Sequence, residues 1–400
     1  MKVAFFQRIF AHYQSGLVKE LARGSPHAYR FFSDTCDPMS SGIEPLPADL
    51  RDQIPFTACR TTHFSLRLAF QWRAVWEALF GQFDAFIFEG SLTMPTNWLA
   101  LLAAKARRKQ VFFYTHGWRQ PDGFWKKLLR CGLYRPADGL LLYGLRAVRL
   151  GLRAGFPAGK LHVVYNCLND QDIRIQSARV SEIQCQAFRR ECFGPDAARP
   201  MVVAVGRLVA AKRLALVIEA VGLLMQDGLN VNLVFVGDGP ERETLAALAK
   251  ATGVHLTFTG ARHDESFLAV VFASADLSVI SGAAGLSVIH SLSYGTPVVV
   301  HGNESVQGPE TEAVEAGHNG AVFLEGDVGD LARNIGRVLR ELPRGQLTAA
   351  RCRHVIDTNY NPVSMRKVFD RAISGEPAPD SSQAVSGRGR MGVISDRQII

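Results

Sequence analysis

Short apolar runs alternate with helical stretches along most of this chain, and the alternation occurs in two series. Strands rich in β-branched and aromatic residues that alternate with helices are typical of a mainly parallel sheet covered by helices. The first series has apolar runs at residues 2–6, 85–89, 110–116, 139–143 and 161–166, with helical patterns such as 66–80 and 96–108 between them. The second series has them at residues 201–206, 232–239, 256–260, 275–281 and 296–300. We therefore predict an α/β chain with two doubly wound, Rossmann-like sheets.

The alternation pauses at about residues 169–200, where the pattern predicts a linker with one short amphipathic helix. We accordingly predict a first domain over residues 1–170 and a second over 171–355. A final helix is expected over 356–374, with its start marked by Asn361-Pro362. Residues 375–400 are rich in Gly, Pro, Ser and charge, which favours a disordered tail. Two such domains would leave a cleft between them, and ligands of open α/β sheets bind beyond the carboxyl ends of the strands.

Composition indicates a soluble protein of 400 residues, with 47% hydrophobic and 20% charged residues. No apolar run approaches the roughly 20 residues of a membrane-spanning helix, and the start of the chain is better explained as a strand than as a signal peptide. The seven cysteines form no CxxC pair and no zinc-type cluster. We predict reduced thiols and a cytoplasmic location.

The positive charge is concentrated in the first half of the chain. The net charge is +8, and residues 1–176 contain 23 basic and 13 acidic residues. Anionic lipid, nucleic acid, an anionic substrate and simple surface solubility all remain compatible with this imbalance. We expect no nucleic-acid partner, because no basic and aromatic recognition module stands out.

One basic stretch also carries large apolar side chains. Residues 123–135, GFWKKLLRCGLYR, mix basic residues with Trp, Phe, Leu and Tyr at roughly helical spacing. This pattern predicts an interfacial helix on an anionic membrane, hence a peripheral location on the inner face of the cytoplasmic membrane. The alternative is an ordinary surface helix with Leu128, Leu129 and Leu133 in the core.

Two basic residues follow the first strand of the second series. Arg207 leaves the strand end after Gly206, and Lys212 lies five residues on, where we expect the next helix to begin. Cations at a helix N-terminus oppose the helix dipole, a cost that a bound anion would relieve. The pair is therefore predicted to bind a phosphate, with Arg as a planar fork and Lys as a point charge.

A turn of small residues, SGAAG at 281–285, separates the strand at 275–281 from a helix that starts near Leu286. Backbone amides at Gly285 and Leu286 can approach a ligand closely, and the helix N-terminus suits a diphosphate. His290 lies five residues past Gly285, and we predict that it reaches a sugar hydroxyl or a phosphate. The alternative is a structural histidine.

Other strand ends carry weaker signals. GDGPERE at 237–243 forms a tight turn whose role is as easily structural as ligand-binding. TGAR at 259–262 could bring backbone groups beside a flat base, and Arg262 is included in the predicted donor site. After the strand at 296–300, Glu310 and Glu312 are favoured over Glu315 as carboxylates that bind sugar or ribose hydroxyls.

Taken together, these motifs resemble the nucleotide-binding half of family 4 glycosyltransferases, which are retaining enzymes with the two-domain GT-B fold. The resemblance covers about residues 200–345, with six motifs in order, among them VVAVGRLVAAKR, LVFVGDGPERETL and GLSVIHSLSYGTPVVV. The first half matches more loosely through FFYTHG and the segment that ends in YNCLND, and residues 359–373 resemble the terminal helix that crosses back to the first domain. The chain resembles in particular a subset of bacterial capsule and lipopolysaccharide transferases, which shares the IHSLSYGTPV pattern and a later acidic PExEA segment.

The resemblance implies roles for individual residues. Arg207 and Lys212 match the diphosphate-binding pair, and Gly285 and Leu286 match the loop whose amides meet the donor. His116 matches a first-domain histidine near the transferred sugar. Glu312 matches a carboxylate that precedes a Gly-x-Asn-Gly turn, here Gly317 to Gly320.

The chain departs from the family at two positions. The family usually has two glutamates eight positions apart, one contacting the donor sugar and one the ribose, and here these positions are Gly282 and His290. The comparison with the capsule-type enzymes would make His290 a substitute ligand and Glu310 a compensating acid.

The activity that the resemblance implies is transfer of a hexosyl group from a nucleotide-diphosphate sugar to a glycan or lipid-linked acceptor, in surface polysaccharide biosynthesis. We expect no cofactor and no metal, because Arg207 and Lys212 can stabilise the leaving diphosphate and no Asp-x-Asp motif follows a strand. His116 would orient the sugar or the acceptor. Two alternatives stay open: a nucleotide-sugar epimerase on the same fold, and a non-catalytic binding subunit. The base, sugar, acceptor, linkage and oligomeric state are not specified by the sequence.

Overall fold

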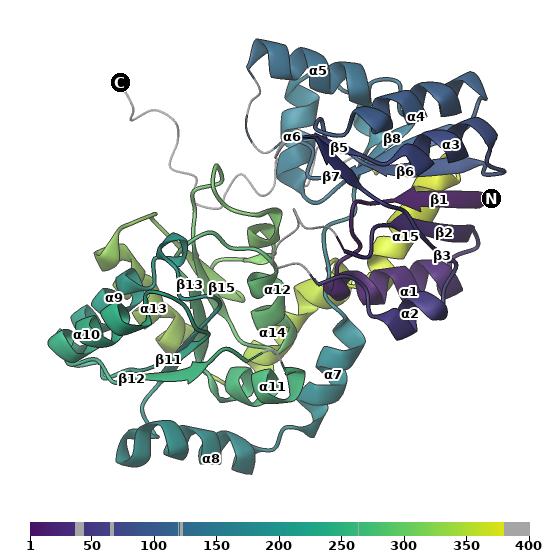
Figure 1. Cartoon of the computed structure of the whole chain (residues 1–400). Helices are drawn as coiled ribbons and strands as arrows, with labels where there is room; N and C mark the ends of the chain where they lie inside the picture. Colours follow the sequence, from purple (N-terminus) through teal and green to yellow (C-terminus); the bar gives the residue numbers. More distant parts are fainter. Residues whose placement is uncertain (37–43, 65–67, 119, 121–122, 263, 380–400) are drawn as a thin grey trace. The chain divides into compact units, whose positions relative to one another are not determined.

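The chain forms two compact units, each with its own parallel sheet (Figure 1). The computed structural model describes residues 1–36, 44–64, 68–118, 120, 123–262 and 264–379. Unit 1 contains Met1–Asn169 and the segment that starts at Asn359, and unit 2 contains Asp170–Thr358. The predicted disordered tail begins at residue 375, and its part from 380 on lies outside the described residues. The prediction of two doubly wound α/β sheets is confirmed.

The sheet of unit 1 has seven parallel strands in the order β3-β2-β1-β6-β7-β8-β9. β1, β6 and β7 are buried on both faces, which explains their continuous apolar sequences. The strands are β1 (Lys2–Phe6), β2 (Ala28–Ser33), β3 (Phe56–Ala58), β6 (Ala85–Glu89), β7 (Gln110–Thr115), β8 (Gly139–Leu142) and β9 (Leu161–Val163). β2 and β3 lie outside the predicted runs.

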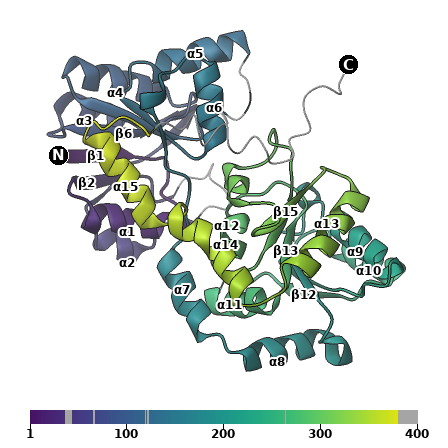
Figure 2. The same ribbon diagram turned by 180° about the vertical axis from the view of Figure 1, so that it is seen from behind.

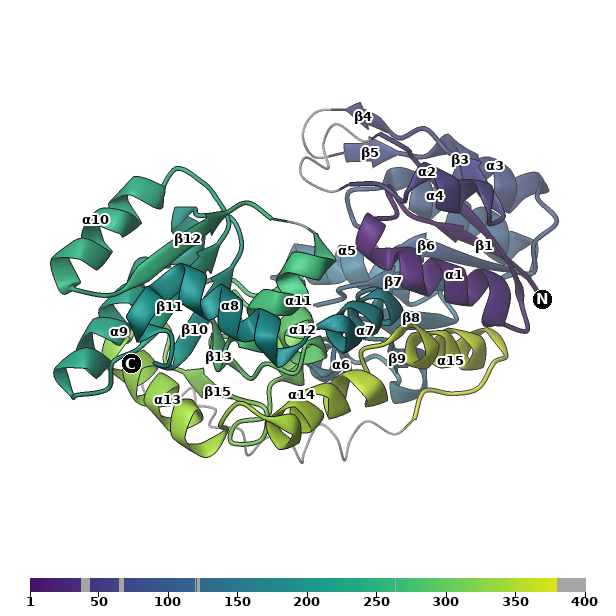
Figure 3. The same cartoon turned by 90° about the horizontal axis from the view of Figure 1, so that it is seen from below.

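Helices cover both faces of this sheet. On one face α1 (Ser15–Gly24) packs beside α15 (Pro362–Ile373), the helix that returns from the C-terminal end of the chain (Figures 2 and 3). Arg366 of α15 fixes this pairing through an ion pair to Glu20 of α1 at 2.8 Å, and it also pairs with Asp370 of its own helix at 2.7 Å. The other face carries α3 (Trp72–Phe80), α4 (Pro95–Ala106), α5 (Phe124–Tyr134) and α6 (Leu145–Arg153). The shorter elements are η1 (His12–Gln14), α2 (Ala48–Asp52) and η2 (Ala158–Lys160).

The predicted helix over residues 66–80 is wrong at residues 68–70, and residues 66 and 67 lie outside the described part of the chain. Leu68–Phe70 is a strand, β5, which pairs antiparallel with β4 (Thr62–Phe64), and the helix α3 begins only at Trp72. Ala69 is buried between two half-exposed neighbours, and this alternation is that of a strand. Apolar residues continue from β5 into α3, so the sequence pattern did not show where the two-residue period of the strand gives way to the helical period.

The sheet of unit 2 has six parallel strands in the order β12-β11-β10-β13-β14-β15. Successive connections run outward from β10 to β12, and then return to β13 on the other side of β10. The order therefore reverses between β10 and β13. The strands are β10 (Met201–Val205), β11 (Asn232–Val236), β12 (Leu256–Gly260), β13 (Leu277–Ile280), β14 (Val298–His301) and β15 (Gly320–Phe323).

Two helix layers enclose this sheet. One layer contains α9 (Ala215–Gln226), α10 (Arg242–Thr252) and α13 (Val328–Glu341), and the other α11 (Glu265–Ser274), α12 (Leu286–Ser293) and α14 (Gln346–Thr358) (Figure 1). The expected single helix in the linker is wrong: α7 (Asp170–Arg179) and α8 (Glu182–Phe193) are both helical, and η3 (Gly194–Asp196) follows. α7 has mostly polar residues with Ile173 alone buried, so its hydrophobic pattern was too weak to predict it.

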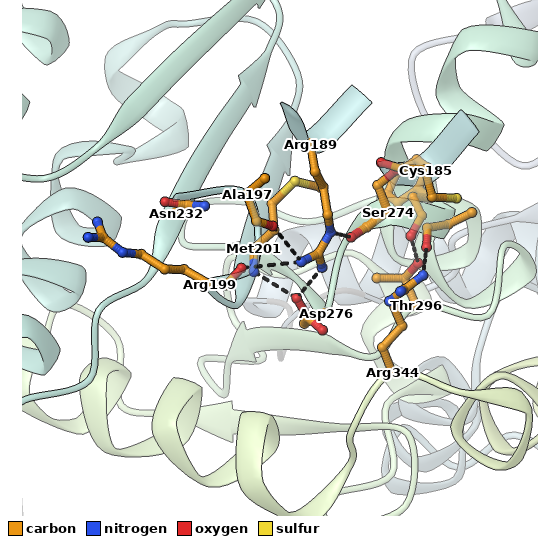
Figure 4. A network of polar contacts seen from close by, with 12 residues as sticks. Cys185, Arg189, Ala197, Arg199, Met201, Asn232, Ser274, Asp276, Thr296 and Arg344 are labelled. Carbon is orange, nitrogen blue, oxygen red and sulfur yellow. Dashed lines mark hydrogen bonds and ion pairs between the residues drawn. The ribbon is translucent and has the colours of Figure 1, made fainter. Parts of the chain in front are cut away.

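A buried arginine attaches α8 to the amino ends of the central strands. Arg189 on α8 bonds the carboxylate of Asp276, just before β13, at 2.5 Å and the carbonyl of Ser274 at 2.8 Å (Figure 4). The same carboxylate oxygen accepts the amide of Met201, at the start of β10, at 2.7 Å. The carboxyl ends of the strands lie at the opposite edge of the sheet and remain available for a ligand.

Two further observations bear on the predicted cellular setting. Among the described residues, no helix combines the length and the apolar character needed to cross a membrane. All seven cysteines lie in the described part of the chain and are free thiols.

Candidate functional site

The reversal of strand order in unit 2 brings two loops together at the carboxyl ends of β10 and β13. Open α/β sheets bind their ligands at such a reversal. A small pocket lies there, lined from the first loop by Gly206, Arg207 and Lys212 and from the second by Ser281. The predicted phosphate pair and the predicted small-residue turn therefore form one site.

Lys212 reaches across the site to the second loop. It ends a short 3-10 turn, η4 (Ala210–Lys212), before α9, and does not lie in the first turn of α9 as predicted. Its Nζ donates to the carbonyl of Ala283 at 2.9 Å. Burial lowers the pKa of Lys212, because the charged form loses hydration there. An anion in the site would restore part of that stabilisation. Arg207 is exposed beside it.

Residue 282 cannot carry a side chain in this arrangement. Ser281 donates from its hydroxyl to the carbonyls of Lys212 and Arg213, at 2.9 and 3.0 Å, and so ties the two loops together. A Cβ on Gly282 would lie 2.2 Å from the carbonyl oxygen of Ala211 and 2.7 Å from Cα of Lys212. The absence of a glutamate here is thus part of the loop packing.

The small-residue turn leads into α12, whose N-cap is Gly285 and whose first residue is Leu286. A Cβ added to Gly285 would meet no atom within 4 Å, so the space in front of this helix start is open. The free amides of the first turn carry partial positive charge. The turn and the cations of the neighbouring loop both favour an anionic ligand.

His290 points from α12 toward α11. Its Nε2 lies 3.0 Å from a carboxylate oxygen of Glu265, the first residue of α11, and its ring packs against Phe272 and Tyr294. The hydroxyl of Tyr294 donates to the same carboxylate oxygen at 2.5 Å. The structure therefore relates His290 to a carboxylate that the sequence motifs did not single out.

Glu310 lies on the far side of the small-residue turn, in the 3-10 turn η5 (Pro309–Ala313) after β14. Two hydrogen bonds join this segment to the turn: the amide of Gly308 donates to Ala284 at 3.2 Å, and the amide of Ala284 donates to Gln307 Oε1 at 2.7 Å. The side chain of Glu310 is buried, and one carboxylate oxygen would lie 2.6 Å from a Cβ on Gly308. Glu312, in the same 3-10 turn, is partly buried.

The turn after β11 supports the first loop. The amide of Gly206 donates to Val236 at 2.9 Å, and that of Leu208 donates to Asp238 at 2.9 Å. A Cβ on Gly237 would lie 1.9 Å from the carbonyl oxygen of Gly206, so the glycine is required for this contact. GDGPERE is thus a structural support.

Arg262, predicted to contact the donor, has local partners after β12. Its Nε pairs with Asp264 at 2.9 Å, and its guanidinium lies 4.1 Å from the ring centre of Phe267. Both partners belong to the start of α11. Arg262 therefore lies beside the helix end that carries Glu265.

Sequence reasoning missed a second set of polar residues at this edge. Arg213 pairs with Glu325 at 2.7 Å, and the amide of Asn303 donates to the same carboxylate. Buried His301 lies close by, and its pKa is lowered, mainly by burial. Arg213 and Glu325 lie more than a hundred positions apart, with His301 and Asn303 between them, so the proximity of these residues had no signal in the sequence.

His116 belongs to unit 1, at the carboxyl end of β7. Its ring packs edge-on against Tyr143, with ring centres 4.3 Å apart. The following residue, Gly117, has φ +58° and is held by two bonds: its amide donates to the Thr115 hydroxyl at 3.1 Å, and its carbonyl accepts from Arg130 of α5 at 2.6 Å. The turn that carries His116 is therefore held rigidly by buried groups.

Comparison with known proteins identifies relatives of this arrangement. Residues 187–350 match the family described as glycosyl transferases group 1. A GDP-mannose-dependent alpha-(1-6)-phosphatidylinositol dimannoside mannosyltransferase of Mycobacterium tuberculosis is 38% identical over 120 residues, which cover 29% of this chain and 30% of the relative. The lipopolysaccharide core biosynthesis glycosyltransferase LpsE of Rhizobium meliloti is 32% identical over 213 residues, 52% of this chain and 59% of the relative. The chain thus spans less than two thirds of these relatives.

Solved structures extend the likeness to nearly the whole chain. The HepE protein of Anabaena in complex with UDP superposes with a TM-score of 0.68 at 19% identity, covering 94% of this chain and 100% of that one. The apo form of the lipopolysaccharide outer core galactosyltransferase WaaB gives 0.65 at 17% identity, with 94% and 99% coverage. At these identities the likeness concerns the fold, which is GT-B.

Proposed function

We propose that this chain, a GT-B protein whose residues 187–350 belong to the group 1 glycosyl transferases, is a retaining hexosyltransferase of family 4. It moves a sugar from a nucleotide-diphosphate sugar to a glycan or lipid-linked acceptor in surface polysaccharide biosynthesis. One observation carries the proposal: a cationic pair and an open helix start converge where the strand order of unit 2 reverses. The likeness to a lipopolysaccharide core biosynthesis glycosyltransferase and to a phosphatidylinositol dimannoside mannosyltransferase supports the acceptor class.

The diphosphate of the donor binds between the two loops. Arg207 and Lys212 contact its oxygens from one side, and the amides of Gly285 and Leu286 do so from the other. Lys212 already lies against the small-residue turn, so its ammonium needs little reorganisation. These groups stabilise the negative charge that grows on the leaving diphosphate as the anomeric C–O bond breaks.

Two carboxylates replace the glutamates that the family usually places at positions 282 and 290. Glu310, buried next to the small-residue turn, faces the donor sugar hydroxyls, and Glu265 accepts from the ribose hydroxyls. The side chain of Glu265 is 39% exposed, whereas that of His290 is 16% exposed. The carboxylate is therefore the more accessible of the two, and His290 orients it. Arg262 contacts Asp264 and Phe267 at the start of α11, the helix that carries Glu265. Glu312 lies in the same 3-10 turn as Glu310.

The acceptor hydroxyl attacks from the same face that the diphosphate leaves, and its proton passes to a phosphate oxygen. The new C–O bond forms as the old one breaks, so the products are the glycosylated acceptor and the nucleoside diphosphate. His116 orients the sugar or the acceptor, and its rigid turn supports this role. The reaction needs no metal in this scheme, because Arg207 and Lys212 supply the positive charge.

The enzyme works at the cytoplasmic side of a membrane, where a lipid-linked acceptor is presented. The exposed apolar and basic residues at the start of α5 support contact with an anionic lipid surface.

The test is a thermal-shift panel with UDP, GDP, ADP and CMP on wild type, Arg207→Ala/Lys212→Ala and the control Arg333→Ala. Arg333 lies on α13, and its side chain is 70% exposed. A ligand that binds the native state raises the melting temperature. At a ligand concentration of a hundred times Kd, it adds about 2.7 kcal/mol to the free energy of unfolding. We expect one diphosphate to stabilise wild type and Arg333→Ala and to leave the double variant unshifted. An equal shift in all three proteins would contradict the proposed phosphate site.

A product assay separates the enzyme from the alternatives. The absence of glutamate at positions 282 and 290 is the observation that favours a non-catalytic binding subunit. With the matching nucleotide sugar, the proposed transferase releases nucleoside diphosphate, slowly to water and faster to an acceptor. Interconversion of the sugar without release would indicate an epimerase, and tight binding without turnover a binding subunit.

A further inference from the structure

Helix α3 is apolar on its outer side as well as its inner side. Ala74 and Ala78 face the core, yet Trp72, Trp76 and Phe80 are 59%, 58% and 58% exposed. The three exposed residues recur every four positions and so form one stripe. A helix that is apolar on opposite sides requires a second apolar contact besides the core.

The neighbouring helix α4 repeats this pattern. Ala100, Leu101 and Ala104 are buried, whereas Leu99 and Leu102 are 46% and 62% exposed. α3 and α4 belong to the helix layer that covers one face of the unit 1 sheet (Figure 1). The sides of both helices that face away from the sheet therefore point the same way. The two stripes therefore lie on one surface of unit 1.

Helix α5 continues this layer beyond α4. A Cβ on Gly132 of α5 would lie 3.3 Å from the ring of Trp98 on α4, so the two helices are in contact. Leu133 and Tyr134 anchor the end of α5 in the core, but residues 123–129 are all exposed. Phe124 and Trp125 are 73% and 74% exposed, and Leu128 and Leu129 are each 56% exposed. The alternative that places Leu128, Leu129 and Leu133 in the core is therefore wrong for the first two, and only the third of these leucines is buried.

The charge on these helices has one sign. α3, α4 and α5 contain five basic residues and one acidic residue. The acidic residue, Glu77, is buried and paired with Arg73 at 2.6 Å. Lys126 and Lys127 are exposed between the apolar residues of α5. A partner that binds this surface must therefore offer apolar groups to the exposed aromatic and leucine side chains and negative charge to the basic residues.

We infer that the outer side of α3, α4 and α5 is a membrane-docking surface, which seats its aromatic and leucine side chains in the interface of an anionic bilayer. Trp and Phe suit the headgroup level, and basic residues within a Debye length of the surface are attracted to anionic lipid. A second copy of the chain is a poorer occupant, because a symmetric interface would bring two copies of the same basic surface together. The inference is independent of which sugar the chain transfers.

The test uses sedimentation of the full chain with vesicles of phosphatidylcholine alone or with about 30% phosphatidylglycerol, which gives the surface a negative potential. We expect binding to the anionic vesicles and release at about 0.5 M salt, where the Debye length is only a few Å. Tryptophan emission should shift to the blue, because Trp72, Trp76 and Trp125 are exposed in the free protein.

Three variants assign the surface. Trp76→Ser/Phe80→Ser and Trp125→Ser/Leu128→Ser should each weaken partition about tenfold or more, and Lys126→Glu/Lys127→Glu should remove the preference for anionic vesicles. The matched control is Ile183→Ser on α8, because Ile183 is 79% exposed in unit 2. All substituted side chains are exposed, so each variant should keep its wild-type melting temperature, which is checked by circular dichroism.

The proposal is overturned if neither vesicle composition binds the wild type, or if the control weakens binding as much as the α3 and α5 variants do. A wild-type dimer in light scattering that the same variants dissociate would assign the surface to self-association and equally refute it. Nucleotide binding is measured in parallel. Its loss in Arg207→Ala/Lys212→Ala with vesicle binding intact would separate the two sites.

Discussion

The imidazole of His290 and the hydroxyl of Tyr294 converge on one carboxylate oxygen of Glu265, at 3.0 and 2.5 Å. His290 in α12 and Tyr294 at the end of that helix thereby orient Glu265, the first residue of α11. Burial and the neighbouring Glu265 raise the pKa of Tyr294, so its hydroxyl stays protonated and remains a donor. In the proposed site, the histidine that the sequence presents as a ligand would therefore position this carboxylate.

Glu265→Gln should weaken binding of the matching nucleoside diphosphate about tenfold, because a hydrogen bond to a charged group is typically stronger than a neutral one. The variant should also lose the preference for the ribonucleotide over its 2′-deoxy analogue. Isothermal titration of both nucleotides measures the two effects. Glu243→Gln, an acid in the first turn of α10, is the control. A variant that keeps full 2′-deoxy discrimination would disprove ribose contact by Glu265.

Gly282→Ala should destabilise the protein by about 1–3 kcal/mol and remove the nucleotide response, since its Cβ overlaps the backbone of Ala211 and Lys212. Urea unfolding gives the first quantity and thermal shift the second. Gly345→Ala is the matched control, because a Cβ there meets no atom within 4 Å. Its free energy of unfolding should stay within about 0.5 kcal/mol of wild type.

Lys212→Ala should lower the rate of nucleoside diphosphate release about a hundredfold or more, as loss of a preorganised electrostatic contact does in other enzymes. EDTA should leave the wild-type rate unchanged, because the proposed stabilisation comes from side chains and amides. Release of nucleoside diphosphate from the donor sugar measures both. Restoration of the wild-type rate only by added Mg²⁺ would show that the charge is supplied differently.

Arg189→Met should destabilise unit 2 by about 3–5 kcal/mol, because it leaves the Asp276 carboxylate partly buried without its cation (Figure 4). Arg333→Met, which removes an exposed pair with Asp330, should cost less than about 1 kcal/mol. Chemical denaturation of both variants gives the comparison. Equal effects would mean that burial of the first pair is unimportant.

The free energy of unfolding should fall as the pH decreases from about 6.5 toward 4. Burial lowers the pKa of His162 from its ordinary 6.5 to about 4, so in this window the unfolded chain binds a proton that the folded chain does not. The loss from this residue is at most about 3 kcal/mol. Urea unfolding at several pH values measures it.

His162→Leu should flatten this slope, and His301, whose pKa is also lowered, should account for part of the remainder. His354→Leu, at an exposed position of α14, should leave the slope unchanged. If the free energy of unfolding of His162→Leu depended on pH as steeply as that of the wild type, other groups would be responsible for the pH dependence.

The fold could be predicted where burial leaves a continuous apolar run. The central strands of both sheets are buried on both faces, so β10, β11 and β13 were found directly. β2 alternates exposed and buried residues at its start, and β15 begins with the small residues Gly320 and Ala321, so neither stood out. The hairpin strand β5 failed for the opposite reason, because it merges with the apolar pattern of α3.

The candidate site was predictable only where its residues directly follow strands. Arg207, Lys212 and the small-residue turn obey this rule, because carboxyl ends of parallel strands share one edge. Glu265, Gln307 and Glu325 reach the same edge through contacts between distant loops, which no local spacing encodes. The orientation of His290 depended on a neighbour in another helix for the same reason.

The contact between Gly282 and the Ala211–Lys212 backbone also constrains how this lineage can change. A glutamate cannot be introduced at position 282 in one step, because the loop after β10 occupies its space. The first change would have to move residues 211 and 212, and that change would disturb the hydrogen bonds from Ser281 and Lys212. Substitutions at the two loops are therefore ordered, and each is harmful without the other. Related sequences that carry a side chain at 282 should also differ in the segment at 210–213.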